Sequence, residues 1–180
     1  MTAQSEMALR RGGRVFIRYP TQKDSDAFLD VVHSSRTFYA GLVDPPASAE
    51  AFAAYLGRSC GDEFCSILVL RTADETLLGV YELGALAEDG GVLQASITCY
   101  VSAAYAGRGY MGEALRLVLD FAFADLGLGR LVADVPEGNE QTEALVHACG
   151  FRRKGTGVNT YGDRRWAMSR ADWGRLVEAP

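Results

Sequence analysis

A glycine-rich stretch near the middle of the chain has residue types and spacing suited to binding an anion. It follows a β-branched run that ends at Val101, and an apolar stripe at helical spacing begins at Met111. This order places backbone N–H groups at the start of a helix, where the helix dipole favours negative charge and no intrahelical acceptor competes for them. Gly107, Gly109 and Gly112 have no Cβ atom and let the backbone approach oxygen atoms closely. The stretch therefore predicts a phosphate-binding loop.

The spacing of these glycines also satisfies a dinucleotide-binding fingerprint. The pattern is Gly107-x-Gly109-x-x-Gly112, and Asp134 lies roughly 20 residues further on, after a second strand-like run. A dinucleotide fold, however, places its first glycine directly after a strand and needs several parallel strand–helix–strand units. Residues 102–106 separate strand and glycine here, and the preceding strands are predicted to be antiparallel. We therefore expect a different phosphate ligand.

The elements predicted around the loop follow the order β-α-α-β-β-β-α-β-α-β-β. The expected strands cover residues 15–19, 64–71, 77–86, 92–101, 131–135, 152–154 and 164–170. The expected helices begin at Asp24, after Ser48, at Tyr110 and after Asn139, and a last helical turn covers 171–177. Short turns between the central strands favour an antiparallel meander, whereas the helix after them predicts one parallel pair. The fold class is therefore mixed α/β (α+β).

Length and composition indicate one globular domain. The chain has 180 residues and a net charge of −5, so we expect a single domain over residues 14–180 and a flexible N-terminal tail over residues 1–13. The acidic balance argues against nonspecific nucleic-acid binding. No stretch is apolar enough to span a membrane, and we expect a cytoplasmic protein, either monomeric or homodimeric. No metal-ligand spacing is found. The four cysteines are expected to be buried thiols: Cys60, Cys65, Cys99 and Cys149.

Several short motifs accompany the loop in a fixed order. They are Tyr-Ala-Gly-Arg-Gly-Tyr-Met-Gly-Glu-Ala-Leu at 105–115, Phe-Ala-Phe at 121–123, Leu-Gly-Leu-Gly-Arg at 126–130, Pro-Glu-Gly-Asn at 136–139 and Cys-Gly-Phe at 149–151. Through them most of the chain resembles a Gcn5-related N-acetyltransferase (GNAT), and in particular the enzymes that acetylate the N-termini of ribosomal proteins. The resemblance implies a mostly antiparallel mixed sheet with a V-shaped split, flanked by helices, and acetyl-CoA as cosubstrate.

The resemblance also implies which residues bind the cosubstrate. The glycine-rich loop would bind the pyrophosphate of acetyl-CoA, and the strand that ends at Val101 would split from its neighbour near that residue and pair with the pantetheine arm. The implied cofactor-binding residues are Tyr100, Val101, Gly107, Arg108, Gly109, Tyr110, Met111, Gly112, Asn139 and Thr142. The chain departs from the family at Ala106, where Arg or Gln is usual, and at Met111, where Gly or Ala is frequent. Because backbone N–H groups do most of the binding, we expect only modestly weaker cofactor binding.

Acetyl transfer to an amine needs a neutral amine, donors at the thioester oxygen and a proton for the departing thiolate. In the ribosomal-protein branch a Glu before the loop often acts as the base, but Ser96 matches that position here, with Thr98 next on the same face. Glu82 in the preceding strand is the nearest replacement, acting directly or through water; the structural alternative is an exposed strand residue. Thr142 matches the Ser that protonates the thiolate, and its alternative role is a polar residue in the first helical turn. Val146 replaces the Tyr proton donor of other relatives.

The other chemically active side chains are interpreted as structural. His147 falls on a helix face with glutamates and is expected to be exposed, and His33 has no identifiable partner. Cys149 suggests a covalent intermediate but has no base beside it, so packing is expected. Three tyrosines are candidates for an acceptor cleft, although core positions are commoner for such residues: Tyr39, Tyr55 and Tyr81.

Three functions follow from these observations. The first is transfer of acetyl from acetyl-CoA to a primary amine by direct attack in a ternary complex, with a protein N-terminus as the acceptor. The second has a small-molecule acceptor such as a polyamine, an amino acid or an aminoglycoside. The third is a catalytically silent acyl-CoA-binding module, which the missing strand Glu suggests. No nucleic-acid or membrane partner is expected.

Overall fold

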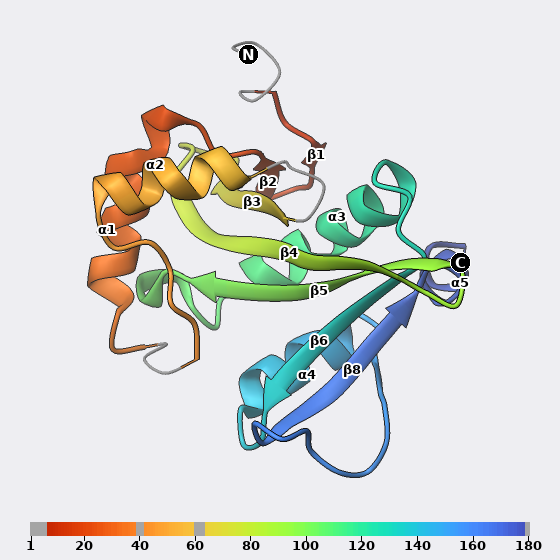
Figure 1. Ribbon diagram of the computed structural model, residues 1–180. Helices are drawn as coiled ribbons and strands as arrows, with labels where there is room; N and C mark the ends of the chain where they lie inside the picture. The colour runs from red at the N-terminus through yellow and green to blue at the C-terminus, as the bar shows by residue number, and fades with distance from the viewer. Residues whose placement is uncertain (1–6, 39–41, 60–63, 179–180) are drawn as a thin grey trace.

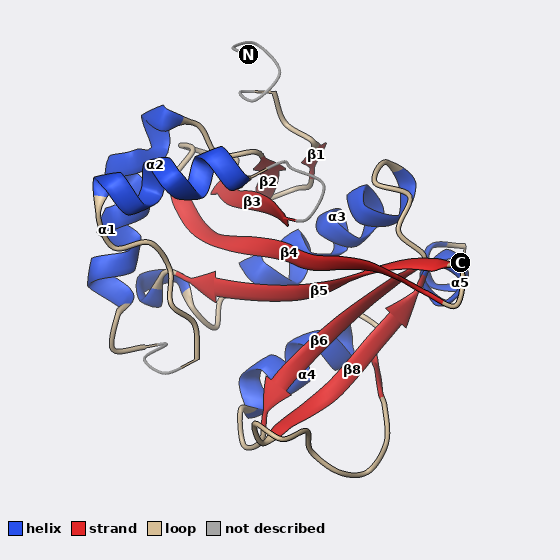
Figure 2. Cartoon of the chain, in the orientation of Figure 1, coloured by secondary structure: helices blue, strands red, loops and turns tan. Residues whose placement is uncertain are grey.

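The computed structural model describes residues 7–38, 42–59 and 64–178, which form a single eight-stranded sheet flanked by helices (Figures 1 and 2). The sheet order is β1-β2-β3-β4-β5-β6-β8-β7. Its strands are β1 (Arg10–Arg11), β2 (Val15–Arg18), β3 (Phe64–Arg71), β4 (Leu77–Asp89), β5 (Val92–Val101), β6 (Arg130–Pro136), β7 (Arg152–Arg153) and β8 (Asp163–Ser169). The helices are α1 (Ser25–Ser35), α2 (Ala49–Arg58), α3 (Tyr110–Ala124), α4 (Glu140–Ala148) and α5 (Arg170–Val177), with 3-10 turns η1 (Gln22–Asp24) and η2 (Ala103–Tyr105).

Strands β1 to β5 pair antiparallel in chain order, which confirms the predicted meander. Strands β3 and β5 have the predicted bounds, but β4 continues past Leu86 to Asp89. The extension follows from an irregularity between Gly84 and Ala87, after which the β4–β5 ladder resumes and reaches the Asp89–Val92 pair. Only β5 and β6 pair in parallel, so the several parallel units of a dinucleotide fold are absent from the described part of the chain.

The sheet splits between β5 and β6. Their pairing is confined to three positions and ends at Ser96 and Val132. Beyond that point β5 stays paired with β4 as far as Val101, and β6 stays paired with β8 as far as Pro136. The two strands therefore diverge as a wedge, which is plain in Figure 1. The predicted V-shaped split is confirmed, but it begins at Ser96 and not near Val101.

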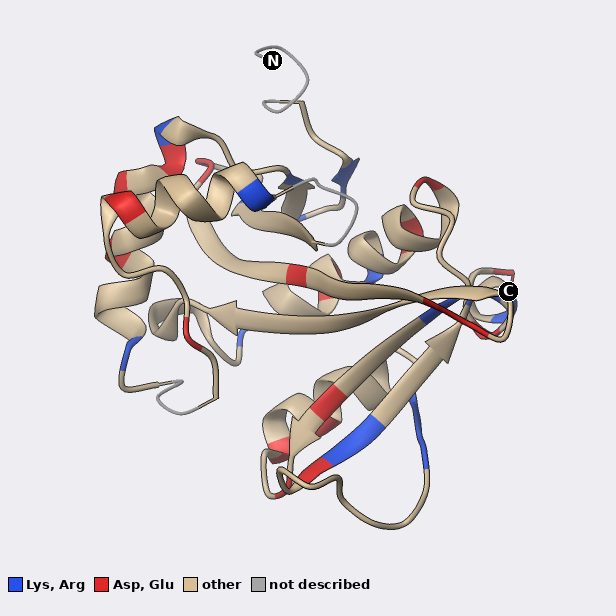
Figure 3. Ribbon diagram, viewed as in Figure 1, with Lys and Arg blue, Asp and Glu red and all other residues tan. Residues whose placement is uncertain are grey.

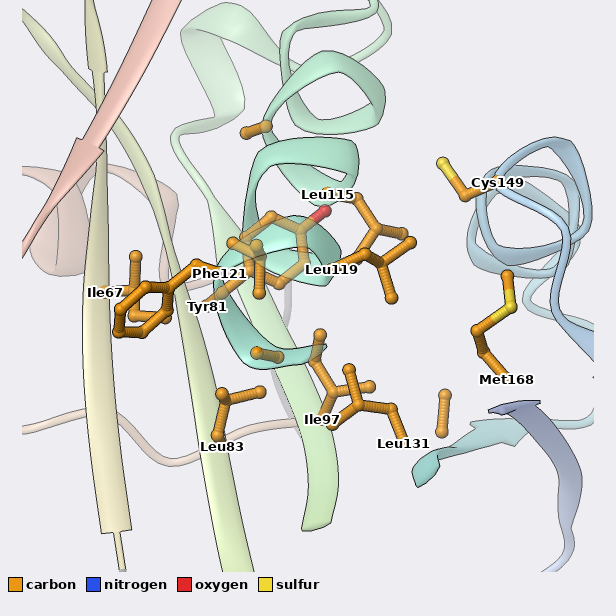
Figure 4. Close-up of a cluster of buried hydrophobic side chains, with 14 of the residues drawn as sticks. Ile67, Tyr81, Leu83, Ile97, Leu115, Leu119, Phe121, Leu131, Cys149 and Met168 are labelled. Carbon is orange, nitrogen blue, oxygen red and sulfur yellow. The ribbon is translucent and has the colours of Figure 1, made fainter. Parts of the chain in front are cut away.

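Each face of the sheet has its own core, because strand side chains alternate between faces. On one face, α1 and α2 cover a cluster that includes Phe28, Phe52 and Val80. On the other face, α3 and α4 cover a larger cluster, in which Figure 4 shows Tyr81 between β4 and α3. In β4, Val80 therefore faces α1 and α2 whereas Tyr81 faces α3 and α4, and the alternation shifts at the irregularity near Leu78, which packs with Tyr81.

The N-terminal segment is more ordered than the sequence predicts. Residues Arg10–Arg11 form β1 and pair with β2, so the predicted tail over residues 1–13 is wrong at this point. The physical reason is the side chain of Arg10, which forms ion pairs with Asp120 and Asp125 at the C-terminal end of α3. Residues 1–6 lie outside the described residues.

The cysteines that the structure describes are free thiols. Cys65 and Cys149 are buried, as predicted, whereas Cys99 is half-buried. Burial, together with the charge of Glu82, raises the pKa of the Cys99 thiol to about 12. Cys60 lies outside the described residues. Among the helices of the described ranges, none is both long enough and apolar enough to cross a membrane.

Candidate functional site

The glycine-rich loop has the predicted phosphate-cradle geometry. Gly107 and Gly109 have φ values of +71° and +79°, in a region that side chains with a Cβ rarely adopt. Gly109 is the N-cap of α3 and supplies no side chain to satisfy the first helical N–H groups. The backbone donors of the first turn of α3, which begins at Tyr110, are therefore available to an external anion.

The loop opens onto a cleft of about 970 Å³ that fills the split between β5 and β6. All of the predicted cofactor-binding residues except Arg108 line it. Arg108 is exposed, and its guanidinium lies 5.6 Å from the centroid of the Tyr105 ring. The loop, the diverging strand β5 and the first turn of α4 thus meet at one cavity, although they lie far apart in sequence.

The floor of the cleft is tied to the start of α3. The hydroxyl of Tyr81, on β4, donates a hydrogen bond of 2.9 Å to the carbonyl oxygen of Met111. Burial raises the pKa of the Tyr81 hydroxyl well above its usual value, so it stays protonated and remains a donor. Along the cleft, the pairing of β5 with β6 ends at Ser96, and among the described residues no other strand joins β5 on that side. Its backbone groups on that side can therefore pair with an extended ligand.

The opposite wall is the first turn of α4. Asn139 is the N-cap, and its Oδ1 accepts the N–H of Thr142 at 3.2 Å. The half-buried Thr142 lines the cleft, as does Asn139. Arg164 braces this turn from β8, since its guanidinium bonds Glu137 at 2.6 Å and Glu143 at 2.9 Å.

Cys149 and Val146 have packing roles in α4. The Cys149 thiol lies 3.6 Å from the carbonyl oxygen of Gly112 and joins α4 to α3. Burial raises the pKa of the Cys149 thiol, which opposes formation of a nucleophilic thiolate. Val146 is buried, consistent with packing. The structural interpretation of Cys149 fits these contacts.

Glu82 is at the centre of a hydroxyl network on the α1–α2 face of the sheet. Its Oε1 accepts hydrogen bonds from Tyr55 at 2.7 Å and Tyr100 at 3.3 Å, and its Oε2 accepts one from Thr98 at 3.4 Å. Burial, followed by the charge of Glu82, raises the pKa of the Tyr55 hydroxyl, so this donor keeps its proton. Thr98 and Tyr100 line the cleft, whereas Glu82 lies behind them. Glu82 is therefore half-buried and bonded, unlike a freely exposed strand residue.

Ser96 lies outside the lining of the cleft. Its hydroxyl donates to the carbonyl oxygen of Gly84 at 2.9 Å, at the last β5–β6 pair. His147 is exposed, as predicted, beside the ring of Trp166. His33 does have a contact, because its Nε2 lies 3.0 Å from the carbonyl oxygen of Ala47.

The three tyrosines that the sequence suggested for an acceptor cleft differ in their positions in the structure. Tyr55 and Tyr81 are core residues, exposed by 3% and 2%, and Tyr81 also lines the cleft. Tyr39 lies outside the described residues. Sequence reasoning missed the apolar group Phe38, Leu42 and Val43, which lines the cleft from the segment between α1 and α2. These residues follow the end of a predicted helix and carry no spacing pattern that marks a binding role.

The carboxylates of the cleft are neutralised by arginines. Among the described lining residues, the only acidic ones are Asp134 and Glu137. Arg165 bonds both oxygens of Asp134 at 2.9 Å, and Glu137 is paired with Arg164. Figure 3 shows a red, acidic segment on β6 beside a blue, basic segment on β8. The cleft therefore presents little uncompensated negative charge to a ligand.

Comparison with known proteins agrees with this geometry. Residues 14–152 match the family model described as an acetyltransferase (GNAT) domain. Probable N-acetyltransferase YjcK of Bacillus subtilis is 32% identical over 101 residues, which are 56% of this chain and 55% of that protein. The matched segment thus spans about half the length of that relative.

Solved structures with a similar fold include two acetyltransferases from Vibrio species. Ribosomal-protein-S5-alanine acetyltransferase from Vibrio fischeri has a TM-score of 0.77 and 16% identity, over 91% of this chain and 97% of that one. Spermidine N-acetyltransferase from Vibrio cholerae, in complex with CoA and spermine, has a TM-score of 0.75 and 18% identity, over 90% of this chain and 99% of that one. The two proteins differ in acceptor, and at these identities the likeness concerns the fold.

Proposed function

Because the chain belongs to the GNAT acetyltransferase domain family, we propose that its cleft binds acetyl-CoA and that the protein transfers the acetyl group to the α-amino group of a peptide or protein. The observation that carries this proposal is the meeting of the glycine-rich loop with the split of the sheet at one cleft. A left-handed loop at a helix N-terminus suits a pyrophosphate, and a strand that diverges from its neighbour suits an extended, amide-containing arm.

The bound cosubstrate would supply an activated thioester. Residues of the chain would bind it, polarise the thioester and transfer protons. The loop from Gly107 to Gly112 and Asn139 would hold the nucleotide and the arm. The exposed backbone of β5 would donate to the thioester oxygen. Thr142 lies across the cleft from β5, and its hydroxyl would relay to the leaving sulfur the proton that the acceptor nitrogen loses as the amide forms.

Glu82 would accept one proton from the ammonium group of the acceptor, and the neutral amine that results would attack the thioester. Glu82 does not reach the cleft surface itself, so the transfer would pass through the Thr98 hydroxyl or a water beside it. Tyr55 and Tyr100 would hold the carboxylate in place, since both donate to Oε1. This arrangement replaces the Glu that the ribosomal-protein branch carries at the position of Ser96.

The lining of the cleft favours a peptide α-amine over a polyamine. A polyamine carries several positive charges and calls for unpaired carboxylates, but Asp134 and Glu137 are each bonded to an arginine. The segment between α1 and α2 instead offers apolar side chains, with Phe38 exposed by 44% and Leu42 by 49%. Such a surface suits the side chain of a peptide's first residue.

A matched set of acceptors tests the proposal. The set is a peptide with a free N-terminus, the same peptide with its N-terminus blocked and one internal lysine retained, and spermidine. We expect release of CoA and a singly acetylated α-amine with the free peptide alone. Turnover with spermidine and none with peptides would assign the small-molecule function. Binding of acetyl-CoA with no turnover on any acceptor would indicate the silent module.

A further inference from the structure

We infer that Arg14 is a positioning residue that orients the glycine-rich loop before acetyl-CoA arrives. The inference rests on the proposed function, because it concerns how the loop binds the pyrophosphate. Arg14 lies just before β2, more than ninety positions from the loop in sequence, and its side chain reaches the outer side of the loop. It belongs to none of the motifs that mark the cofactor site.

Three donors of the Arg14 side chain are committed to the loop and the helix behind it. Nη1 donates to the carbonyl oxygen of Arg108 at 3.2 Å, and Nη2 donates to that of Gly109 at 3.3 Å. Nε donates to Glu113 at 2.9 Å, and the backbone N–H of Arg14 donates to the other carboxylate oxygen at 2.8 Å. The planar guanidinium thus fixes two consecutive carbonyl groups relative to α3.

Peptide geometry gives this contact a directional consequence. In a trans peptide the carbonyl group of one residue points opposite to the N–H group of the next. By holding the carbonyls of Arg108 and Gly109, Arg14 turns the N–H groups of Gly109 and Tyr110 to the other side, and both residues line the cleft. Glycines on their own allow many loop conformations, so this restraint favours the anion-binding one.

Arg14 is itself held in place, and its positive charge is paired with a carboxylate. Its carbonyl oxygen accepts the N–H of Thr72 at 2.9 Å, and its guanidinium lies 4.9 Å from the centroid of the Tyr110 ring. Glu113 neutralises its charge. A Cβ on Gly12 would lie 2.7 Å from Oε1 of Glu113, so a glycine there leaves room for the carboxylate. Arg14 therefore contributes to the loop mainly by orienting its carbonyl groups, and less by its positive charge.

Comparing two acetyl donors distinguishes a role of Arg14 at the glycine-rich loop from a general contribution to folding. Acetyl-CoA contains the pyrophosphate, and acetyl-pantetheine lacks it. For Arg14→Ala we expect the KM and Kd for acetyl-CoA to rise about tenfold, with kcat and the KM for acetyl-pantetheine unchanged, because only the first donor needs the ordered loop. Arg14→Lys should behave like Arg14→Ala, because one ammonium group cannot bond both carbonyl oxygens and Glu113 as the planar guanidinium does. Arg11→Ala, in the adjacent strand, is the control and should match the wild type.

A second variant covers the case in which Arg14→Ala folds poorly. Glu113→Gln keeps the volume of the side chain and loosens its hold on Arg14, so a smaller rise in the Kd for acetyl-CoA is expected. The inference is overturned if Arg14→Ala binds acetyl-CoA as tightly as the wild type, or if both donors lose activity equally. A wild-type protein that neither binds nor uses acetyl-CoA would instead refute the proposed function.

Discussion

At the scale of single residues, Glu82 is the group whose role depends most on its neighbours. Tyr55 comes from α2, and Tyr100 and Thr98 come from β5, yet their hydroxyls meet at one carboxylate. A strand glutamate with three hydroxyl partners beside a cleft is held in one orientation. It is therefore suited to repeated proton transfer.

Replacing Glu82 tests this role. For Glu82→Gln, which keeps the shape and removes the base, we expect kcat to fall about 10²-fold with the KM for acetyl-CoA unchanged. The rate of the variant should rise with pH towards the pKa of the acceptor amine, because only amine that is already neutral can react. Steady-state rates over a pH series with the free peptide measure both effects. Unchanged kcat would remove Glu82 from the proposed mechanism.

The residues of the loop could be predicted from sequence, and those around Glu82 could not. Gly107 and Gly109 adopt positive φ values that a local pattern can indicate, because the helix follows directly. The partners of Glu82 depend on strand register, in which Ser66, Glu82 and Thr98 share one row across β3, β4 and β5. Sequence periodicity does not determine which strands become neighbours in the sheet.

At the scale of elements, β4, β5 and α3 meet at Gly79. A Cβ there would lie 2.7 Å from the carbonyl oxygen of Tyr100 and 3.0 Å from Sδ of Met111. We expect Gly79→Ala to lower the free energy of unfolding by about 1–3 kcal/mol and to weaken acetyl-CoA binding, because β5 or the start of α3 must shift. Urea unfolding and calorimetric titration measure the two effects.

The matched control for Gly79 is Gly57 in α2, where a Cβ would meet nothing within 4 Å. Gly57→Ala should raise the free energy of unfolding by roughly 0.5–1 kcal/mol, since alanine is the better helix former. If Gly79→Ala were as stable as Gly57→Ala, close packing at this junction would not be needed.

The junction between β2 and α1 gives the protein a pH-dependent stability. Arg18 bonds both oxygens of Asp24, at 2.6 and 2.8 Å, and the N–H of Thr21 adds a bond of 2.7 Å. Burial pushes the pKa of Asp24 up, but these hydrogen bonds outweigh burial and hold it below its ordinary value of 3.8. The stability from Asp24 is therefore fully present above 3.8 and is lost as pH falls through the lower pKa of the folded state.

Substitution of Asp24 tests this dependence. Asp24→Asn should lower the free energy of unfolding by about 2 kcal/mol at neutral pH, and the difference from wild type should shrink in acid. Urea unfolding at a series of pH values measures it. Asp26→Asn, at an exposed position in the same turn, should have little effect at any pH. A difference for Asp24→Asn that is constant with pH would contradict the assignment.

Most elements could be predicted from local patterns, and the exceptions have tertiary causes. Ser48 caps α2 through the N–H of Ala51, as its position before an amphipathic run predicts. Strand β1 could not be predicted, because it is held by ion pairs of Arg10 with acidic residues more than a hundred positions away. The start of the split at Ser96 depends on where β5 and β6 diverge, which no local pattern records.

For the whole molecule, the split in the sheet brings elements from both of its faces to one cleft. Helices α3 and α4 stand with the glycine-rich loop on one side of the wedge, and the segment between α1 and α2 reaches the same cleft from the other face (Figure 1). The order of elements and the motifs predict this architecture and the donor. The proposed preference for a peptide acceptor rests on the paired carboxylates and apolar side chains of the cleft, which only the folded chain brings together.

Calorimetric titration of the full chain with acetyl-CoA measures directly whether the glycine-rich loop and the cleft bind this cosubstrate. We expect saturable binding of one acetyl-CoA per chain that is lost in Gly109→Val, because a β-branched residue is strained at a φ of +79° and its Cβ would lie 3.4 Å from Nη2 of Arg14, so the loop must change shape. Gly90→Val, at a φ of +59° in the β4–β5 turn with nothing within 4 Å, is the matched control and should bind normally. If the wild-type chain did not bind acetyl-CoA, or if Gly109→Val bound it equally well, the glycine-rich loop would not be the cofactor site.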